Sequence, residues 1–121
     1  MKNPGPDHPI SIAAAEGRVQ VILNGEIVAD TLRAKVLKEA SYPPVFYIPR
    51  EDAALDRFTR TATATHCPYK GDATYYSVTV GERTSTDAAW SYEAPFPAMA
   101  AIAGHLAFYP GRVDEIREQT S

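Results

Sequence analysis

Turn-forming residues divide this chain into segments too short for long helices, and this division limits its possible folds. The 121 residues include 10 Pro and 7 Gly. Proline lacks a backbone donor and restricts the residue before it, so Tyr42-Pro43-Pro44 and Pro110-Gly111 interrupt regular structure. Asn24-Gly25 stands between two apolar segments and predicts a β-hairpin, because both central residues of a type I′ turn need positive φ. These breaks favour short antiparallel strands.

We therefore expect a mainly β fold, with two antiparallel sheets of short strands and one or two short helices. Alternating or clustered apolar residues predict the strands. The segments are residues 19–23, 26–30, 45–48, 59–65, 73–80, 88–93, 105–109 and 112–116. Residues 31–40 are compatible with a strand or a short helix, and the alternation of Ala34 and Val36 with polar neighbours favours a strand. Alternation also places Tyr75 and Tyr76 on opposite faces, so one of the two should face out.

Two short helices and three irregular segments complete this interpretation. Pro49 suits the first turn of a helix that runs to about residue 58, with Glu51 and Asp52 near its positive end. Residues 95–102 predict a second helix that ends near Gly104. The irregular segments are a leader at residues 1–9, a loop at residues 66–72 and a polar turn at residues 81–87.

Size and charge limit the class of protein and its partners. At 121 residues and 13.2 kDa, residues 1–121 should form a single domain, because domains usually contain about 100–150 residues. The 15 Asp and Glu residues exceed the 12 Lys and Arg residues, and no two cations are adjacent. Because phosphate backbones and membrane surfaces attract clustered cations, we expect neither nucleic acid nor a membrane as partner. Exposed strand edges are compatible with a homodimer.

A cytoplasmic protein without metal or cofactor is expected. No apolar stretch reaches the about 18 residues that a membrane span needs, and the N-terminus lacks the apolar stretch of a signal peptide. The single cysteine forms neither an internal disulfide nor a thiolate zinc site. The 3 histidines lack the spacing typical of metal ligands.

The only cysteine, Cys67, lies in the densest group of reactive side chains, at residues 66–72. A cationic neighbour such as Lys70 favours the thiolate, so Cys67 is a candidate nucleophile. His105 is the preferred base if the last helix folds back over the loop. The alternative is that Cys67 is a small buried side chain that only packs. Both interpretations stay open.

Several side chains in the same part of the chain are candidates for ligand binding. Lys70 supplies charge and Gly71 allows close backbone approach, whereas the simpler interpretation of the pair is a turn glycine beside a solvated lysine. Aromatic rings either line ligand sites or form the core. Those concentrated here are Tyr69, Tyr75, Tyr76, Trp90 and Tyr92. Glu93 is a candidate to orient His105 or to bind a ligand cation.

Five motifs occur in an order that resembles a known family. They are Asp30-Thr31, Tyr42-Pro43-Pro44-Val45-Phe46-Tyr47-Ile48-Pro49-Arg50-Glu51-Asp52, Cys67-Pro68-Tyr69-Lys70-Gly71-Asp72-Ala73, Ala89-Trp90-Ser91-Tyr92-Glu93 and Gly104-His105-Leu106-Ala107-Phe108-Tyr109. The string resembles the domain-of-unknown-function 427 family of small bacterial proteins over essentially the whole chain.

The resemblance implies a β-tent fold, in which two antiparallel sheets lean together as in Mss4-like proteins and B-type methionine sulfoxide reductases. Zinc held by two Cys-x-x-Cys pairs joins the sheets in many such folds, and this chain has no such pair. Packing by Phe46, Trp90, Tyr92 and Phe108 would replace the zinc. An aromatic cage on one sheet is a recurring ligand site of related folds. The family is also labelled nucleotidyltransferase-like, but the Gly-Ser step and spaced acidic ligands of that class are absent here.

The sequence is compatible with two functions from different classes. The first is a small-molecule-binding module with a pocket walled by Tyr69, Trp90 and Tyr92, and with Lys70, Gly71 and Glu93 as further ligand-binding residues. The second is a thiol-dependent enzyme in which Cys67 attacks, His105 transfers the proton and Lys70 stabilises charge. Nucleotidyl transfer ranks below both.

Overall fold

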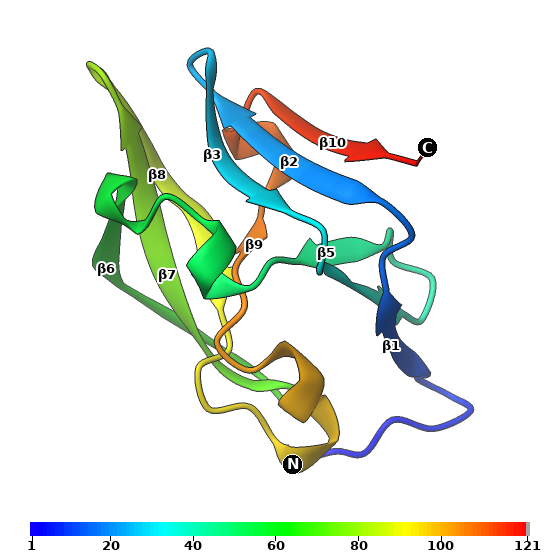
Figure 1. The fold of residues 1–121 in the computed structure, drawn as a ribbon. Coiled ribbons are helices and arrows are strands. Elements are labelled where there is room, and N and C mark those ends of the chain that lie inside the picture. Colours follow the sequence, from blue (N-terminus) through cyan, green and yellow to red (C-terminus); the bar gives the residue numbers. More distant parts are fainter. Residues whose placement is uncertain (121) are drawn as a thin grey trace.

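Antiparallel strands form most of this protein. The computed structural model describes residues 1–120. Its strands are β1 (Ile10–Ala14), β2 (Arg18–Leu23), β3 (Glu26–Thr31), β4 (Lys35–Glu39), β5 (Val45–Tyr47), β6 (Phe58–Cys67), β7 (Gly71–Val80), β8 (Arg83–Ser91), β9 (Ala107–Phe108) and β10 (Glu115–Gln119). They form three sheets with the orders β1-β4-β5, β10-β2-β3 and β6-β7-β8-β9 (Figure 1). The mainly β class is confirmed, with three sheets in place of two.

The third sheet arises because a long hairpin bends in the middle. The predicted turn at its tip is confirmed, since Asn24 and Gly25 have φ angles of 50° and 78°. Beyond β2 and β3 the same two segments continue into β1 and β4, which pair in a separate sheet. At the bend the Ala15 amide still donates to the Ala34 carbonyl at 2.9 Å. One hairpin thus contributes strands to two sheets.

The sheet of β6 to β9 packs against other elements on both faces. Tyr76 belongs to a core cluster with Val21 and Val28 of the β2–β3 hairpin. Tyr75 belongs to a second cluster, which contains Leu37 and Tyr47 of the sheet formed by β1, β4 and β5. Tyr75 and Tyr76 are 8% and 9% exposed. The expectation that one of them faces out is wrong, because both faces of β7 are covered.

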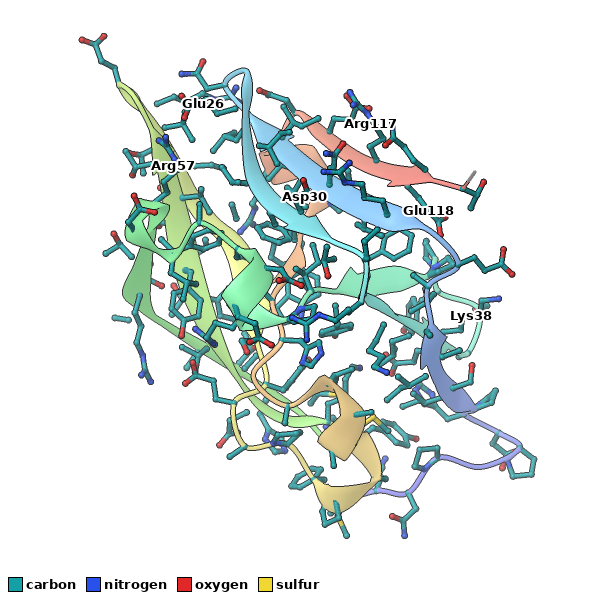
Figure 2. The ribbon with its side chains drawn as sticks, in the orientation of Figure 1. Glu26, Asp30, Lys38, Arg57, Arg117 and Glu118 are labelled. Atoms are coloured by element: carbon teal, nitrogen blue, oxygen red, sulfur yellow. The ribbon has the colours of Figure 1, made fainter. Side chains whose placement is uncertain are left out.

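The helix expected at residues 49–58 is replaced by two 3-10 helices, η1 (Arg50–Asp52) and η2 (Leu55–Arg57). Ala53 separates them, because it adopts an extended conformation with φ −111° and ψ 152° and forms a bridge with Ala29 of β3. Pairing with the neighbouring strand therefore prevents a continuous helix. The second 3-10 helix also contacts the β2–β3 hairpin through an ion pair. Arg57 Nη2 lies 2.6 Å from Glu26 Oε2, and both side chains are labelled in Figure 2.

The second predicted helix is also a 3-10 helix, η3 (Pro97–Ile102), which buries Met99 and Ile102. Gly104 follows it with φ 71°. A further 3-10 helix, η4 (Pro110–Arg112), occupies the segment where the last strand was expected to begin. The last strand, β10, therefore starts only at Glu115.

Both irregular segments in the middle of the chain are shorter than expected. Cys67 pairs directly with Gly71 across β6 and β7, so the turn contains only residues 68–70. β8 begins at Arg83, so the polar segment after Gly81 is mostly strand. Strand pairing extends close to each turn because the polar residues there face solvent and still form ladder hydrogen bonds.

The leader at residues 1–9 has no named strand or helix, but it contacts the β6–β7 turn. The Lys2 amide donates to the Pro68 carbonyl at 2.7 Å. The His8 ring stacks on Tyr69 with ring centres 4.0 Å apart and an interplanar angle of 8°. These contacts place the start of the chain beside the turn that carries Lys70. β1, which no pattern predicted, follows directly with Ile10 and Ile12 on its inner face.

Candidate functional site

A cavity of about 490 Å³ lies among β2, β5, β8, β9 and β10, and we name it the outer chamber. Its walls are almost entirely apolar and aromatic. They are formed by Val21, Tyr42, Pro43, Pro44, Val45, Phe46, Ile48, Trp90, Phe108, Tyr109, Pro110 and Ile116. No Asp, Glu, Lys, Arg or His belongs to this wall. The cavity thus offers an uncharged, largely apolar environment.

A smaller cavity of about 170 Å³ adjoins it, and we name it the inner chamber. The two chambers share the residues Tyr42, Pro43, Val45, Trp90 and Tyr109. The residues that belong only to the inner chamber are Leu37, Glu39, Tyr47, Lys70, Tyr75 and Tyr92. Polar groups are therefore concentrated at one end of the combined space.

Lys70 and Glu39 form an ion pair in the wall of the inner chamber. Lys70 Nζ lies 2.5 Å from Glu39 Oε1, and the two side chains are only 8% and 16% exposed. Glu39 ends β4 and Lys70 lies in the β6–β7 turn, so the pair joins two sheets. The other carboxylate oxygen of Glu39 lies 2.7 Å from His8 Nε2. The Lys70 ammonium also lies over the Tyr92 ring, 5.8 Å from its centre.

Glu39 is ionised at neutral pH despite its partial burial. Burial opposes ionisation, but the hydrogen bonds from Lys70 and His8 together outweigh it and hold the pKa of Glu39 below its usual value. The wall of the inner chamber thus contains a compensated pair of opposite charges.

Tyrosine hydroxyls supply the remaining polar groups of the inner chamber. The hydroxyls of Tyr75 and Tyr109 lie 3.0 Å apart, and Thr65 Oγ1 lies 3.0 Å from the same Tyr75 oxygen. Tyr92 is 8% exposed, and within residues 1–120 its hydroxyl has no hydrogen-bond partner. Burial raises the pKa of Tyr92 and of Tyr47. Burial and the Tyr75 hydroxyl raise the pKa of Tyr109 to about 12. Tyr47, Tyr92 and Tyr109 are therefore neutral at physiological pH.

Trp90 lies between the two chambers and belongs to the walls of both. It packs against Tyr109 with ring centres 4.5 Å apart, and edge-on against Tyr47 at 6.3 Å. The pairing register of β8 places Trp90 opposite Tyr75 of β7 and Ala107 of β9. Strand pairing thus fixes the position of the indole in the site.

The structure brings four of the residues proposed from the sequence together, since the inner chamber is lined by Lys70, Tyr75, Trp90 and Tyr92. Cys67 lies next to them, with its Sγ 3.6 Å from Lys70 Nζ, but it belongs to neither chamber wall. Tyr69 stacks on His8 instead of facing the chambers. Gly71 has φ 113° and lies against residues 94–96, so its conformation already explains the glycine.

Glu93 and His105 lie outside the two chambers. Glu93 accepts hydrogen bonds from the Tyr76 hydroxyl and from Arg50, whose Nη2 lies 3.0 Å away. His105 Nδ1 lies 3.0 Å from the Ala103 carbonyl. In the described part of the chain no hydrogen bond joins His105 to Cys67 or to Glu93.

Sequence patterns missed Glu39, Tyr47 and Tyr109 as members of the site. Glu39 lies 31 residues before its partner Lys70. No local spacing links residues that far apart, and Tyr109 was expected only as the end of a strand. The pairing of β4 with β1 and β5 brings Glu39 to the chamber.

A family model described as "Domain of unknown function (DUF427)" matches residues 11–119. This chain belongs to the DUF427 family. The family that the five motifs indicated is thereby confirmed. No match was found among the curated proteins.

Two expectations for this DUF427 protein concern membranes and metals. None of the helices in residues 1–120 has both the length and the apolar composition for crossing a membrane. Within the same residues, no three His, Cys, Asp or Glu side chains are grouped so that they could hold a metal ion. The absence of a metal, like the β-tent architecture, stays a prediction.

Proposed function

We propose that this DUF427 protein is a small-molecule-binding module whose ligand occupies the outer and inner chambers. The observation that carries the proposal is the size and composition of the outer chamber, about 490 Å³ with Trp90, Phe108 and Tyr109 in its wall. Ligand sites are typically concave and mostly apolar, with volumes of about 300–1,000 Å³ and a few polar groups. The inner chamber provides those polar groups.

The outer chamber opens to solvent, because its wall includes the exposed residues Tyr42, Pro43, Pro44 and Pro110. A contiguous apolar surface that stays open to solvent commonly marks a ligand groove or an interaction site. Here the aromatic rings face a shared space. Tyr42, which belongs to both walls, is 64% exposed and lies at the solvent side of that space. The geometry therefore suits a ligand that enters past Tyr42.

The thiol-dependent enzyme has one supporting contact, between Cys67 Sγ and Lys70 Nζ at 3.6 Å. Its expected base, His105, is bonded to the Ala103 carbonyl. Because Cys67 lines neither chamber, a ligand held there would not reach the thiol without rearrangement. Ligand binding is therefore the better supported proposal, and nucleotidyl transfer ranks below both.

Tryptophan fluorescence tests the proposal directly, because Trp90 is the only tryptophan. The probe is cyclohexylbutanamide, an apolar ring with an amide head that does not absorb where tryptophan is excited. We expect that addition of this probe causes a saturable change in the fluorescence emission of Trp90. Val45 belongs to both walls, so Val45→Phe fills the shared space and should weaken binding at least about tenfold, equivalent to about 1.4 kcal/mol.

Leu32→Ala is the matched control, since Leu32 is an apolar side chain that is 76% exposed and lies in neither wall. Cys67→Ser should likewise retain the affinity of the wild type. Thermal unfolding of each variant separates loss of binding from loss of fold. Unchanged affinity in a folded Val45→Phe variant, or no saturable change in the wild type, contradicts the proposal.

A further inference from the structure

We infer that the ligand of the two chambers is an uncharged amphiphile, with an apolar body and a single neutral hydrogen-bonding head such as an alcohol, an amide or a carbonyl. The inference rests on the proposed function and narrows it to a chemical class. Carboxylates, phosphates and ammonium compounds of the same shape are disfavoured.

The only charges in the chamber walls compensate each other. Lys70 and Glu39 lie 2.5 Å apart with little exposure to solvent. An incoming carboxylate would therefore approach a lysine that is already paired, and it would be repelled by Glu39. An incoming ammonium group would approach a glutamate that is already paired, and it would be repelled by Lys70. Disrupting a buried ion pair leaves an uncompensated charge, which is strongly unfavourable.

The outer chamber provides no charge for a ligand of either sign. The Arg112 guanidinium lies over the ring of Tyr109, which belongs to the outer wall, at 4.5 Å, and it donates to the Asp87 carbonyl at 2.9 Å. Transfer of an ionised group from water into such surroundings is costly unless it is paired. The apolar wall thus accommodates the body of the ligand and excludes a charged head.

The tyrosine hydroxyls of the inner chamber suit a neutral head. A hydroxyl donates one hydrogen bond and accepts others, so it pairs with alcohols, amides and carbonyls alike. Tyr92 is the decisive residue, because it lines the inner chamber and its hydroxyl makes no hydrogen bond within residues 1–120. Among these residues no fully buried side-chain oxygen lacks a partner, so the Tyr92 hydroxyl keeps accessible surface and is free to bond a ligand head.

Three probes with one body test the inference on the wild-type protein. They are cyclohexylbutanamide, cyclohexylbutanoate and cyclohexylbutylamine, which are neutral, anionic and cationic at pH 7. Titration calorimetry should give at least tenfold tighter binding of the amide than of either charged probe. Equal or tighter binding of the acid or the amine overturns the inference while the binding module stands. If none of the three binds, the proposed function fails as well.

A substitution in the ion pair tests its physical cause. Glu39→Gln keeps the shape of the side chain but removes its charge, leaving Lys70 without a counter-charge. We expect the affinity for cyclohexylbutanoate to rise at least tenfold and the preference for the amide to narrow or reverse. Glu26→Gln is the matched control, because Glu26 pairs with Arg57, neither residue lines a chamber, and the substitution should leave all three affinities unchanged. A folded Glu39→Gln variant that gains no affinity for the acid overturns the inference.

Discussion

At the scale of single residues, Lys70 has the most unusual environment in the protein. Its side chain is 8% exposed, and its ammonium group contacts Glu39, the Cys67 sulfur and the face of Tyr92. Lysine is almost never buried without a partner, because its charge loses hydration. Glu39 is therefore a structural requirement for the position of Lys70 as well as a part of the ligand site. Lys70 stands out in the sequence, but its partner lies 31 residues away and no local pattern links the two.

Removal of the Lys70 charge should destabilise the fold. Lys70→Met leaves the Glu39 carboxylate with only His8 as a partner, and breaking a largely buried pair costs about 3 kcal/mol. Urea unfolding at pH 7 measures the free energy of unfolding. Arg33→Met is the control, because Arg33 is 59% exposed and its ion pairs with Glu51 and Asp52 lie at the surface. Exposed pairs contribute about 0–1 kcal/mol. Equal losses in both variants would contradict this prediction.

At the scale of elements, the β2–β3 hairpin shows which local signals are reliable. The Asn24-Gly25 pair predicted both the turn type and its location, because positive φ at two successive residues is a local requirement. The same local reasoning was wrong for residues 49–58, where Ala53 pairs with β3 and divides the expected helix. A sequence pattern that depends on backbone conformation alone therefore predicts the local structure. A pattern whose outcome depends on a neighbouring strand does not.

Gly25→Ala should destabilise the hairpin through its backbone conformation. Gly25 has φ 78°, and no atom lies within 4 Å of the position that a Cβ would take. The cost therefore comes from the left-handed conformation alone and is about 1 kcal/mol. Gly111→Ala is the matched control, because Gly111 also has open space around it and does not have positive φ. Urea unfolding of the two variants checks the difference, and equal stability would show that the turn relaxes to another type.

At the scale of the whole molecule, the site forms where separate sheets meet. Glu39 belongs to the sheet of β1, β4 and β5, whereas Trp90 and Tyr75 belong to the sheet of β6 to β9. The ion pair of Lys70 with Glu39 and the stacking of His8 on Tyr69 both join these parts of the chain. Protonation of Glu39 at low pH should therefore weaken the contact between these two sheets. A homodimer, a cytoplasmic location and the absence of nucleic-acid and membrane partners remain predictions.

Glu39 should contribute to a loss of stability in acid. Its pKa is lower in the folded protein than the ordinary value of 4.5, so its stabilising contribution is complete above about pH 4.5 and is lost as the pH falls through the folded-state pKa. Thermal unfolding between pH 7 and pH 2 measures this loss. The Glu39→Gln variant should lose less stability over that interval than the wild type. If the unfolding temperatures of the two proteins fell in parallel with pH, the contribution of Glu39 to acid sensitivity would be contradicted.

The sequence by itself determined the class of fold, the β2–β3 turn, most strand positions and the family. These properties depend on alternation, turn chemistry and motif order, all of which are local or linear along the chain. It also placed Lys70, Trp90 and Tyr92 among the candidate site residues. Only the tertiary structure decided that Cys67, Glu93 and His105 lie outside the chambers and that Glu39 and Tyr109 line them. The physical reason is that strand pairing between distant segments sets which side chains meet, and no local pattern encodes that pairing.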